Sequence, residues 1–208
     1  MKSNYSLMAK IYDPIFHLPL KPIRIAVMNE LLKYKEKKIL DLCCGTGNQF
    51  KLLSKHGFKN LYCLDISGSM LEIAKRSDFS IKIYNEDATK TSFEDALFDV
   101  VIISFAIHEK DRNTQKALIN EAYRIIKKDG LMLVVDYVFD NKTTKLGRIA
   151  VNIIEGIAGG EHYINFKNYI QNKGLLSLIK KDKFKLMKCN RTSFGAVTIS
   201  IYHKILLF

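Results

Sequence analysis

Residues 39–48, ILDLCCGTGN, decide the fold: an apolar run ends at an aspartate and leads directly into two cysteines and two glycines. The apolar run is typical of a buried β-strand, and residues 47–56 carry their apolar side chains at a helical period. A second strand pattern, NLYCLD, follows at residues 60–65. The stretch therefore contains the turn of a strand–helix–strand unit, and this turn has almost no side-chain bulk.

Strand and helix patterns continue to alternate beyond this unit. Helical periods recur in SGSMLEIAKRS and DRNTQKALINEAYRIIKKDG, and strand patterns in SIKIYNED, FDVVIISFA and LMLVVDYV. Five strands with intervening helices predict an α/β fold with a doubly wound, mostly parallel, Rossmann-like sheet. In the longer helix, Asp111 is the expected N-cap, Lys127 and Lys128 lie in the expected last turn, and Gly130 is the expected terminator.

The C-terminal part of the chain departs from this alternation. Residues 142–181 have a helical period that four glycines interrupt, which predicts two or three short helices. FKLMKCN and AVTISIYHKILLF, on either side of RTSFG, predict a C-terminal antiparallel hairpin that brings the sheet to seven strands. We expect a single domain, 1–208, with an N-terminal helical cover at 1–36 and a substrate lid at 142–181.

The chain carries a net charge of +12, from 33 basic and 21 acidic residues. Such an excess can indicate a partner made of phosphate, such as RNA. The few arginines lie far apart, however, and arginine binds phosphate better than lysine does. The lysine excess is therefore more typical of a solvated surface, and we do not expect a nucleic-acid partner.

Four cysteines, Cys43, Cys44, Cys63 and Cys189, lack the paired spacings of a metal site, so we expect reduced thiols and no metal. The N-terminus has no apolar segment leading to a cleavage site, and the longest apolar stretch, VVIISFAI, is too short to span a bilayer. We expect a soluble, cytoplasmic monomer or homodimer, with peripheral lipid contact left open.

The glycine-bearing turn is expected to bind a ligand, because ligands of open α/β sheets bind beyond the carboxyl ends of the strands. Asp65 ends the second strand, 20 residues after Gly45, where a carboxylate can accept hydrogen bonds from both hydroxyls of a ribose. Asp65 could equally cap the helix that begins near Ser67. Phe50 stands where a dinucleotide-binding loop has its third glycine, which favours a nucleoside over a dinucleotide.

Five segments in order resemble the motif series of class I S-adenosylmethionine-dependent methyltransferases over residues 37–138. They are ILDLCCGTG, LYCLDISGSML, NEDA, FDVVIISFAIHE and AYRIIKKDGLMLVVDY. The N-terminal YDPIF is similar to the opening of the small-molecule branch that includes quinone-biosynthesis methyltransferases. The resemblance implies S-adenosylmethionine as cofactor and S-adenosylhomocysteine as product. One position departs from the family, because Cys43 stands where a glycine is usual.

The resemblance also implies roles for individual residues. Asp41 would orient the loop and assist the methionine amino group, and Gly45 and Gly47 would let the backbone meet the methionine portion. Asp65 would hold the ribose hydroxyls, and Asp87 would accept a hydrogen bond from the adenine amino group. The remaining implied cofactor-binding residues are Tyr12, Cys43 and Thr46, Ile66, Met70 and Ala88 near adenine, and Ser104 and Phe105 beside the sulfonium.

Methyl transfer requires donor and acceptor to be held in line, and a base only where the acceptor must lose a proton. Candidate catalytic residues are His108 and Glu109 just past the fourth strand, Tyr137 after the fifth, and His162 in the glycine-flanked insertion. Each has a structural alternative as a loop, surface or core residue. In the same insertion, the aromatic residues at 163, 166 and 169 give one face that lines an acceptor pocket or packs in the core.

The signature Asn-Pro-Pro-Tyr of nucleic-acid N-methylating enzymes is replaced here by ISFA, and the cysteine pair of RNA cytosine-5 enzymes is missing. With few arginines as well, the sequence favours a small, partly apolar methyl acceptor. An RNA or protein methyltransferase and a non-catalytic S-adenosylmethionine-binding module remain the alternatives.

Overall fold

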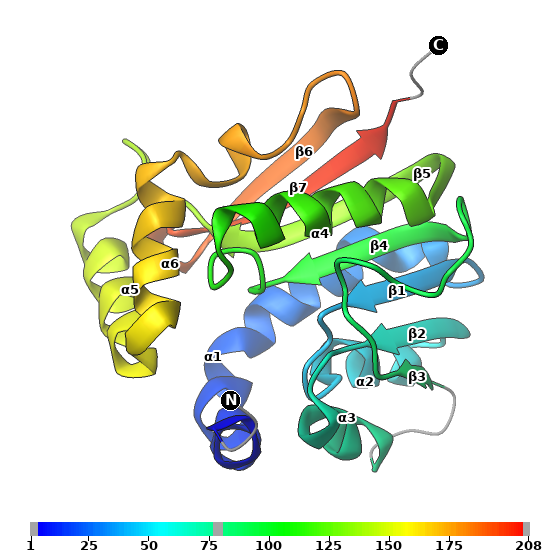
Figure 1. Cartoon of the computed structure of the whole chain (residues 1–208), viewed down its shortest axis with the longest axis horizontal. Coiled ribbons are helices and arrows are strands. Elements are labelled where there is room, and N and C mark those ends of the chain that lie inside the picture. The colour runs from blue at the N-terminus through cyan, green and yellow to red at the C-terminus, as the bar shows by residue number, and fades with distance from the viewer. Residues whose placement is uncertain (1–3, 77–80, 206–208) are drawn as a thin grey trace. The chain divides into compact units, whose positions relative to one another are not determined.

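The computed structural model describes residues 4–76 and 81–205, with side chains from Leu18 onward. The chain divides into two compact units, Met1–Ser92 and Phe93–Phe208. Figure 1 labels the helices and strands of both units. The seven strands belong to a mostly parallel sheet with antiparallel C-terminal strands, which confirms the predicted fold class.

The first unit is an alternation of helices and parallel strands, in which β2 lies between β1 and β3. Its elements are α1 (Asn4–Leu31), η1 (Leu32–Tyr34), β1 (Lys38–Leu42), α2 (Asn48–Lys55), β2 (Asn60–Leu64), α3 (Gly68–Lys75) and β3 (Ile81–Tyr84). In β1 and β2 every residue after the first is buried, as is usual for strands covered on both faces. Because the three strands are parallel, the loops after their carboxyl ends lie at one edge of the sheet.

The second unit contains four strands in the order β4-β5-β7-β6. Its elements are β4 (Phe98–Ser104), α4 (Arg112–Ile125), β5 (Ile126–Tyr137), α5 (Lys145–Ala158), α6 (Gly160–Gln171), η2 (Gly174–Ser177), β6 (Phe184–Thr192), η3 (Ser193–Gly195) and β7 (Val197–Lys204). Strand β4 pairs with β5 in parallel, whereas β7 is antiparallel to both β5 and β6. The predicted C-terminal hairpin is thereby confirmed.

The start of α4 agrees with the prediction and its end does not. Asp111 caps the helix by accepting hydrogen bonds from the N–H groups of Asn113 and Thr114. The prediction of Lys127 and Lys128 in the last turn is wrong, because the helix ends at Ile125 and both lysines belong to β5. Ile125 and Ile126 are fully buried, and the backbone becomes extended at Ile126 to join the sheet.

The turn within residues 126–130 explains the role of Gly130. Asp129, not Gly130, has the left-handed backbone, with φ of 62°. A Cβ on Gly130 would lie 2.6 Å from Cγ2 of Ile126, so the glycine is needed for close packing. Gly130 therefore follows the turn inside β5 and does not terminate the helix.

The segment 142–181 holds α5, α6 and η2, so its helical character is as predicted. Its function as a lid, the cover at 1–36 and the single domain 1–208 stay predictions. Among residues 4–76 and 81–205, no helix combines the length and apolarity needed to cross a membrane.

Candidate active site

The loop after β1 contains two glycines with positive φ, and they differ in what surrounds them. Gly45 has φ of 54°, and a Cβ placed on it would meet nothing within 4 Å. Gly47 has φ of 70° and precedes α2 without a side-chain cap. A Cβ on Gly47 would lie 3.0 Å from the Cβ of Ala74, so the small residue also allows α2 and α3 to pack. The backbone of this loop thus faces open space at Gly45.

Cys43 has the backbone that its family position predicts for a glycine. Its φ is 83°, in the left-handed region that L-residues with a side chain rarely adopt. The turn is nevertheless formed, because the N–H groups of Cys43 and Cys44 both donate to the carbonyl of Leu64 at 2.9 Å. The cysteine therefore keeps the turn at the cost of backbone strain.

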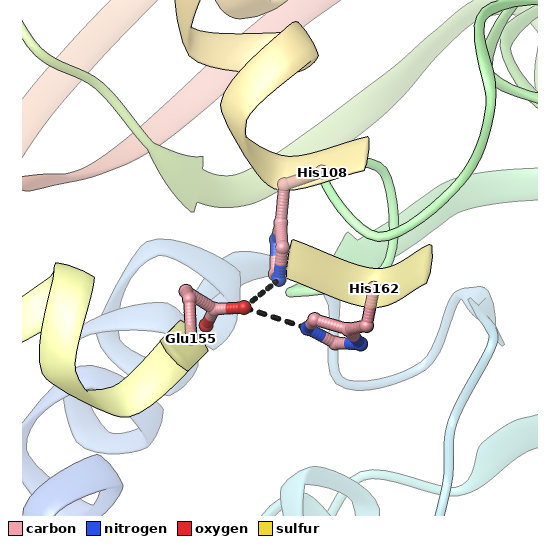
Figure 2. Close-up of side chains that lie close together, drawn as sticks. All are labelled: His108, Glu155 and His162. Atoms are coloured by element: carbon pink, nitrogen blue, oxygen red, sulfur yellow. Dashed lines mark hydrogen bonds and ion pairs between the residues drawn. The ribbon is translucent and has the colours of Figure 1, made fainter. Parts of the chain in front are cut away.

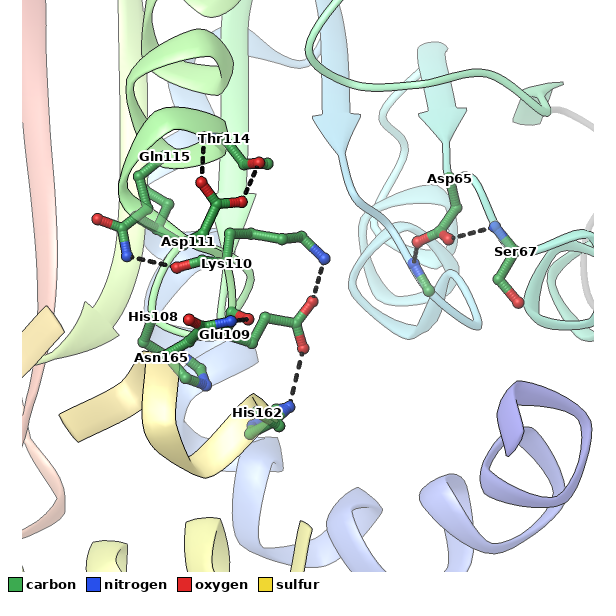
Figure 3. A network of polar contacts seen from close by, with 12 residues as sticks. Asp65, Ser67, His108, Glu109, Lys110, Asp111, Thr114, Gln115, His162 and Asn165 are labelled. Atoms are coloured by element: carbon green, nitrogen blue, oxygen red, sulfur yellow. Dashed lines mark hydrogen bonds and ion pairs between the residues drawn. The ribbon is translucent and has the colours of Figure 1, made fainter. Parts of the chain in front are cut away.

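Asp65 joins the loops after β1 and β2 through its two carboxylate oxygens. Oδ2 accepts the N–H of Gly45 at 2.8 Å. Oδ1 accepts the N–H of Ser67 at 2.8 Å, as Figure 3 shows. Ser67 itself caps α3 by accepting from the N–H of Met70. Asp65 therefore positions the glycine loop as well as the start of α3.

Asp41 is a buried acid at the end of β1. Burial raises the pKa of Asp41, and the nearby charge of Asp65 raises it further, to about 7. Among the described residues, Oδ1 of Asp41 has no hydrogen-bond partner. A buried oxygen without a partner is costly in a folded protein, which marks this position as a place for a ligand donor such as an ammonium group.

The other predicted cofactor residues of the first unit differ in exposure. Ile66 is 65 % exposed, whereas Thr46 and Ala88 are buried and Met70 is half-buried. Asp87 is exposed, and its Oδ1 accepts from both the N–H and the hydroxyl of Thr89. Tyr12 lies in α1, but its side chain is outside the described residues, so its role stays a prediction.

These features together fit a ligand that joins an amino acid to a nucleoside. The open backbone at Gly45 and the unpartnered oxygen of Asp41 would receive the amino-acid part. The start of α2 suits a carboxylate, because the first N–H groups of a helix have no partner within the helix. The exposed Ile66 offers an apolar surface for a base. The residues present therefore fit S-adenosylmethionine.

In the second unit, the chain leaves β4 through a strained residue. Ser104 ends the strand, and Phe105 after it has φ of 52°. The N–H of Phe105 still donates to the carbonyl of Val135 at 2.8 Å, and its ring lies 5.5 Å from that of Tyr137. Strained backbone of this kind is common at functional sites.

His108 lies just beyond this turn and is held by Asp136 at the end of β5. Nδ1 of His108 is 2.7 Å from Oδ1 of Asp136, and both side chains are buried. Asp136 also accepts the backbone N–H groups of Ile107, His108 and Tyr137. Four hydrogen bonds thus fix the carboxylate, which in turn fixes the orientation of the imidazole.

Glu155 of α5 faces two histidines (Figure 2). Its Oε2 is 2.6 Å from Nε2 of His162, on α6, and 3.5 Å from Nε2 of His108. Burial alone lowers the pKa of His108, but Asp136 and Glu155 outweigh burial and raise it to about 10. Burial alone raises the pKa of Glu155, but hydrogen bonds from His108, His162 and Tyr137 outweigh burial and lower it to about 2.

Glu109 completes the cluster from the other side of His162. Its Oε2 lies 3.4 Å from Nδ1 of His162, and its Oε1 pairs with the ammonium of Lys110, as Figure 3 shows. Asn165 of α6 donates to the carbonyl of Glu109 at 3.0 Å, which ties α6 to this loop. The structure thus brings together all four predicted catalytic residues, His108, Glu109, Tyr137 and His162, although their roles stay untested.

The predicted aromatic face of α6 is mainly core. Phe166 and Tyr169 are fully buried, whereas Tyr163 is half-buried. The ring of Phe166 packs within 6.2 Å of those of His108 and Tyr137. The rings of Phe166 and Tyr169 therefore pack against the ring of His108 inside the core. Of the three aromatic residues, Tyr163 alone is accessible to solvent.

Sequence reasoning missed Asp136 and Glu155. Asp136 ends an apolar strand, as Asp41 and Asp65 end theirs, and this shared pattern could have identified it. Glu155 gives a weaker signal, as a single acid inside the apolar run of α5. Its proximity to His108 could not be read from the sequence, because the two residues belong to distant segments.

Comparisons with known proteins agree with this geometry. The sequence model of the family described as "Methyltransferase domain" matches residues 39–130. The ubiquinone/menaquinone biosynthesis C-methyltransferase UbiE of Campylobacter jejuni is 27 % identical, with 86 % of this chain and 83 % of that protein covered. The demethylmenaquinone methyltransferase of Leptospira interrogans is also 27 % identical, with 98 % of this chain and 92 % of that protein covered.

A crystal structure of a protein from Pyrococcus horikoshii OT3 has the same fold. Its TM-score to this chain is 0.68 at 20 % identity, and the match covers 91 % of both chains. The family match, the two relatives and the fold lead to one conclusion. The chain is a class I S-adenosylmethionine-dependent methyltransferase, similar to the methyltransferases of quinone biosynthesis.

Proposed function

We propose that this methyltransferase acts on a small, partly apolar acceptor of the quinone-precursor type. The observation that carries the proposal is the polar cluster of His108, Glu155 and the partly exposed His162, in which His108 packs against the rings of Tyr137 and Phe166. A few polar groups among aromatic side chains suit a flat ring that carries oxygens. The names of the two relatives, both methyltransferases of quinone biosynthesis, support the same class of acceptor.

The proposed donor site lies on the first unit. Asp41 and the loop through Cys43, Gly45, Thr46 and Gly47 would bind the methionine part. Asp65 would accept from the ribose hydroxyls with the oxygens that already hold Gly45 and Ser67. The adenine would contact Ile66, Met70, Asp87 and Ala88, and Tyr12 is a further proposed cofactor-binding residue of this unit. Ser104 and Phe105 are proposed as cofactor-binding residues of the second unit.

When bound, S-adenosylmethionine supplies a methyl group whose bond to sulfur breaks with its electron pair left on sulfur. An electron pair of the acceptor forms the new bond, and the proton that leaves the acceptor is released to water. We propose that His108, Glu109, Tyr137 and His162 hold the polar end of the acceptor. Their part in the rate is orientation, because in-line displacement depends on the position of the acceptor atom.

The segment 142–181 is proposed as a substrate lid. Helix α5 exposes large apolar side chains every three or four residues, at Leu146, Ile149, Ile153 and Ile157, with exposures from 57 to 81 %. An exposed apolar row supports an apolar acceptor. Gly159, between α5 and α6, and Gly160, the first residue of α6, would allow the segment to move. The residues 1–36 are proposed as a second cover of the single catalytic domain 1–208.

The test is a methyl-transfer assay with radiolabelled cofactor on the full-length protein. A 1,4-naphthoquinol with a short prenyl chain at C3 and an open C2 should become labelled, and the same ring without the chain should react more slowly. A metabolite extract serves as the unbiased arm. Labelling of neither the naphthoquinol nor any extract component below about 1 kDa would contradict the proposal.

The net charge of +12 supports one alternative, an RNA acceptor. Binding to RNA through lysines would weaken steeply with salt, because each displaced counterion adds to the slope. We expect no labelling of bulk RNA and no RNA binding at physiological salt. A protein methyltransferase would label proteins in the extract. A non-catalytic binding module would bind S-adenosylhomocysteine and label nothing in the extract.

A further inference from the structure

We propose that Nε2 of His108, Nε2 of His162 and the carboxylate of Glu155 form a binding site for one divalent transition-metal ion of the Zn²⁺ class. The three donor atoms lie within 4.8 Å of one another. They come from the loop after β4, from α6 and from α5. The cysteines, which the sequence analysis considered for metal binding, take no part in this site.

The spacing of the donor atoms is close to that of a metal site. Ligands about 2.0–2.1 Å from a tetrahedral ion lie about 3.3 Å from one another. Oε2 of Glu155 is 3.5 Å from Nε2 of His108 and 2.6 Å from Nε2 of His162. An ion between the three groups would replace the shorter hydrogen bond and would require small shifts of the side chains, mainly that of the partly exposed His162.

The second ring nitrogen of each histidine provides independent support. Nδ1 of His108 lies 2.7 Å from Asp136, and Nδ1 of His162 lies 3.4 Å from Glu109. A metal-binding histidine commonly donates its other N–H to a carboxylate, which fixes the tautomer and orients the ring. His108 has this arrangement, and Nδ1 of His162 lies at ion-pair distance from its carboxylate. Both Nε2 atoms are directed toward one carboxylate oxygen (Figure 2).

The charges around the site also favour a cation. Asp136 is fully buried and Glu155 is 4 % exposed, and a buried carboxylate is stable only when it is paired. Lys110 is paired with Glu109, a third carboxylate near the site, and offsets the charge of that side chain. A divalent ion beside Glu155 and near Asp136 would neutralise the two buried acids of the cluster.

Two histidines and one carboxylate leave at least one coordination position open. Zn²⁺ sites with three protein ligands use that position for water or substrate, and the same donor set also suits Fe²⁺. An oxygen of the acceptor would fit the open position, and the ion would then stabilise negative charge on it. This use of the ion rests on the proposed function, whereas the binding of the ion does not.

The experiment measures Co²⁺ and Zn²⁺ binding to the full-length protein after tag removal and treatment with a chelator. Co²⁺ should give visible d–d absorption bands with a stoichiometry of one per chain, and Zn²⁺ should displace it. Glu155→Gln and His162→Ala should each weaken binding at least tenfold, and Glu109→Gln should weaken it about 10- to 100-fold through its effect on His162. Thermal unfolding of each variant without metal shows whether the fold is retained.

Two control variants distinguish this site from other donors. His56→Ala removes an exposed histidine of the first unit, and Cys189→Ser removes an exposed thiol. Both should bind Co²⁺ as the wild type does. Absence of the d–d bands, or bands that persist in folded His162→Ala and Glu155→Gln, would overturn the metal site. Neither result bears on methyl transfer, which the labelling assay tests separately.

Discussion

The N–H of Gly45 donates to Oδ2 of Asp65 across 20 residues of sequence, at 2.8 Å. The same carboxylate accepts the N–H of Ser67, so one side chain sets the distance between the glycine loop and the start of α3. The residue proposed to bind the ribose therefore also positions the loop proposed to bind the methionine part.

Gly45→Ala and Gly57→Ala form a matched pair. Both glycines have positive φ, 54° and 84°, and at neither would a Cβ meet another atom within 4 Å. Alanine should therefore cost each variant a similar free energy of unfolding, about 1 kcal/mol or somewhat more. Only Gly45→Ala should bind S-adenosylhomocysteine more weakly, by at least tenfold in calorimetry. Equal affinities of the two variants would remove Gly45 from the cofactor site.

Asp41→Asn should change the pH dependence of stability. The pKa of Asp41 is raised from 3.8 to about 7 by burial and by Asp65, so the folded protein binds more protons than the unfolded chain between these values. The contribution of Asp41 to stability is therefore present below roughly pH 4 and is lost as the pH rises to about 7. At pH 8, Asp41→Asn without ligand should be more stable by up to a few kcal/mol.

The same variant should gain less from ligand. An ammonium group near Asp41 would favour its charged form, so S-adenosylhomocysteine should raise the melting temperature of the wild type more than that of Asp41→Asn at pH 8. Parallel melting curves from pH 4 to pH 8, with and without ligand, measure both effects. A variant that is less stable than the wild type at pH 8 would show that Asp41 is satisfied within the protein.

Cys43→Gly tests the strain at the one position that departs from the family. The φ of 83° suits glycine, so the substitution should relieve about 1 kcal/mol of strain, partly offset by the greater freedom of glycine in the unfolded chain. We expect chemical denaturation to show a small gain in stability, with the affinity for S-adenosylhomocysteine retained. A loss above about 1 kcal/mol would mean that the thiol contributes packing that outweighs the strain.

His162→Ala and Phe166→Ala should distinguish a side chain that acts in the candidate site from one that only packs against it. Phe166 is fully buried, so truncation should cost about 3–5 kcal/mol of stability. His162 is partly exposed, so His162→Ala should retain a melting temperature close to that of the wild type and lose methyl transfer selectively. If His162→Ala lowers the melting temperature without a selective loss of turnover, His162 has a structural role instead.

The elements that the sequence predicted well are those determined by local patterns. The alternation from β1 to β5 follows from apolar runs and helical periods, and Asp111 caps α4 because its carboxylate reaches two N–H groups of its own turn. The end of α4 was wrong for a physical reason. Lys127 and Lys128 favour a helix C-terminus locally, but pairing of Ile126 with Phe98 of β4 draws the segment into the sheet.

The same distinction between local patterns and tertiary structure applies to the residues of the candidate site. Gly45 and Asp65 were identified because their spacing within one strand–helix–strand unit is informative. The acids that hold His108 were missed, because Asp136 reaches it across 28 residues and Glu155 comes from a helix whose position no local pattern determines. Five histidine and carboxylate side chains, from the loop after β4, from β5, from α5 and from α6, form this cluster, and only the tertiary structure brings them together.

Calorimetric titration of S-adenosylhomocysteine into the full-length wild-type protein and Asp65→Ala is the sharpest test of the proposed cofactor site. We expect saturable binding at one site per chain in the wild type. We expect affinity at least tenfold lower in Asp65→Ala, because the ribose loses a charged acceptor and the Gly45 loop loses its anchor. Absence of binding to the wild type, or equal affinity in a folded Asp65→Ala protein, would contradict the assignment of this cofactor site.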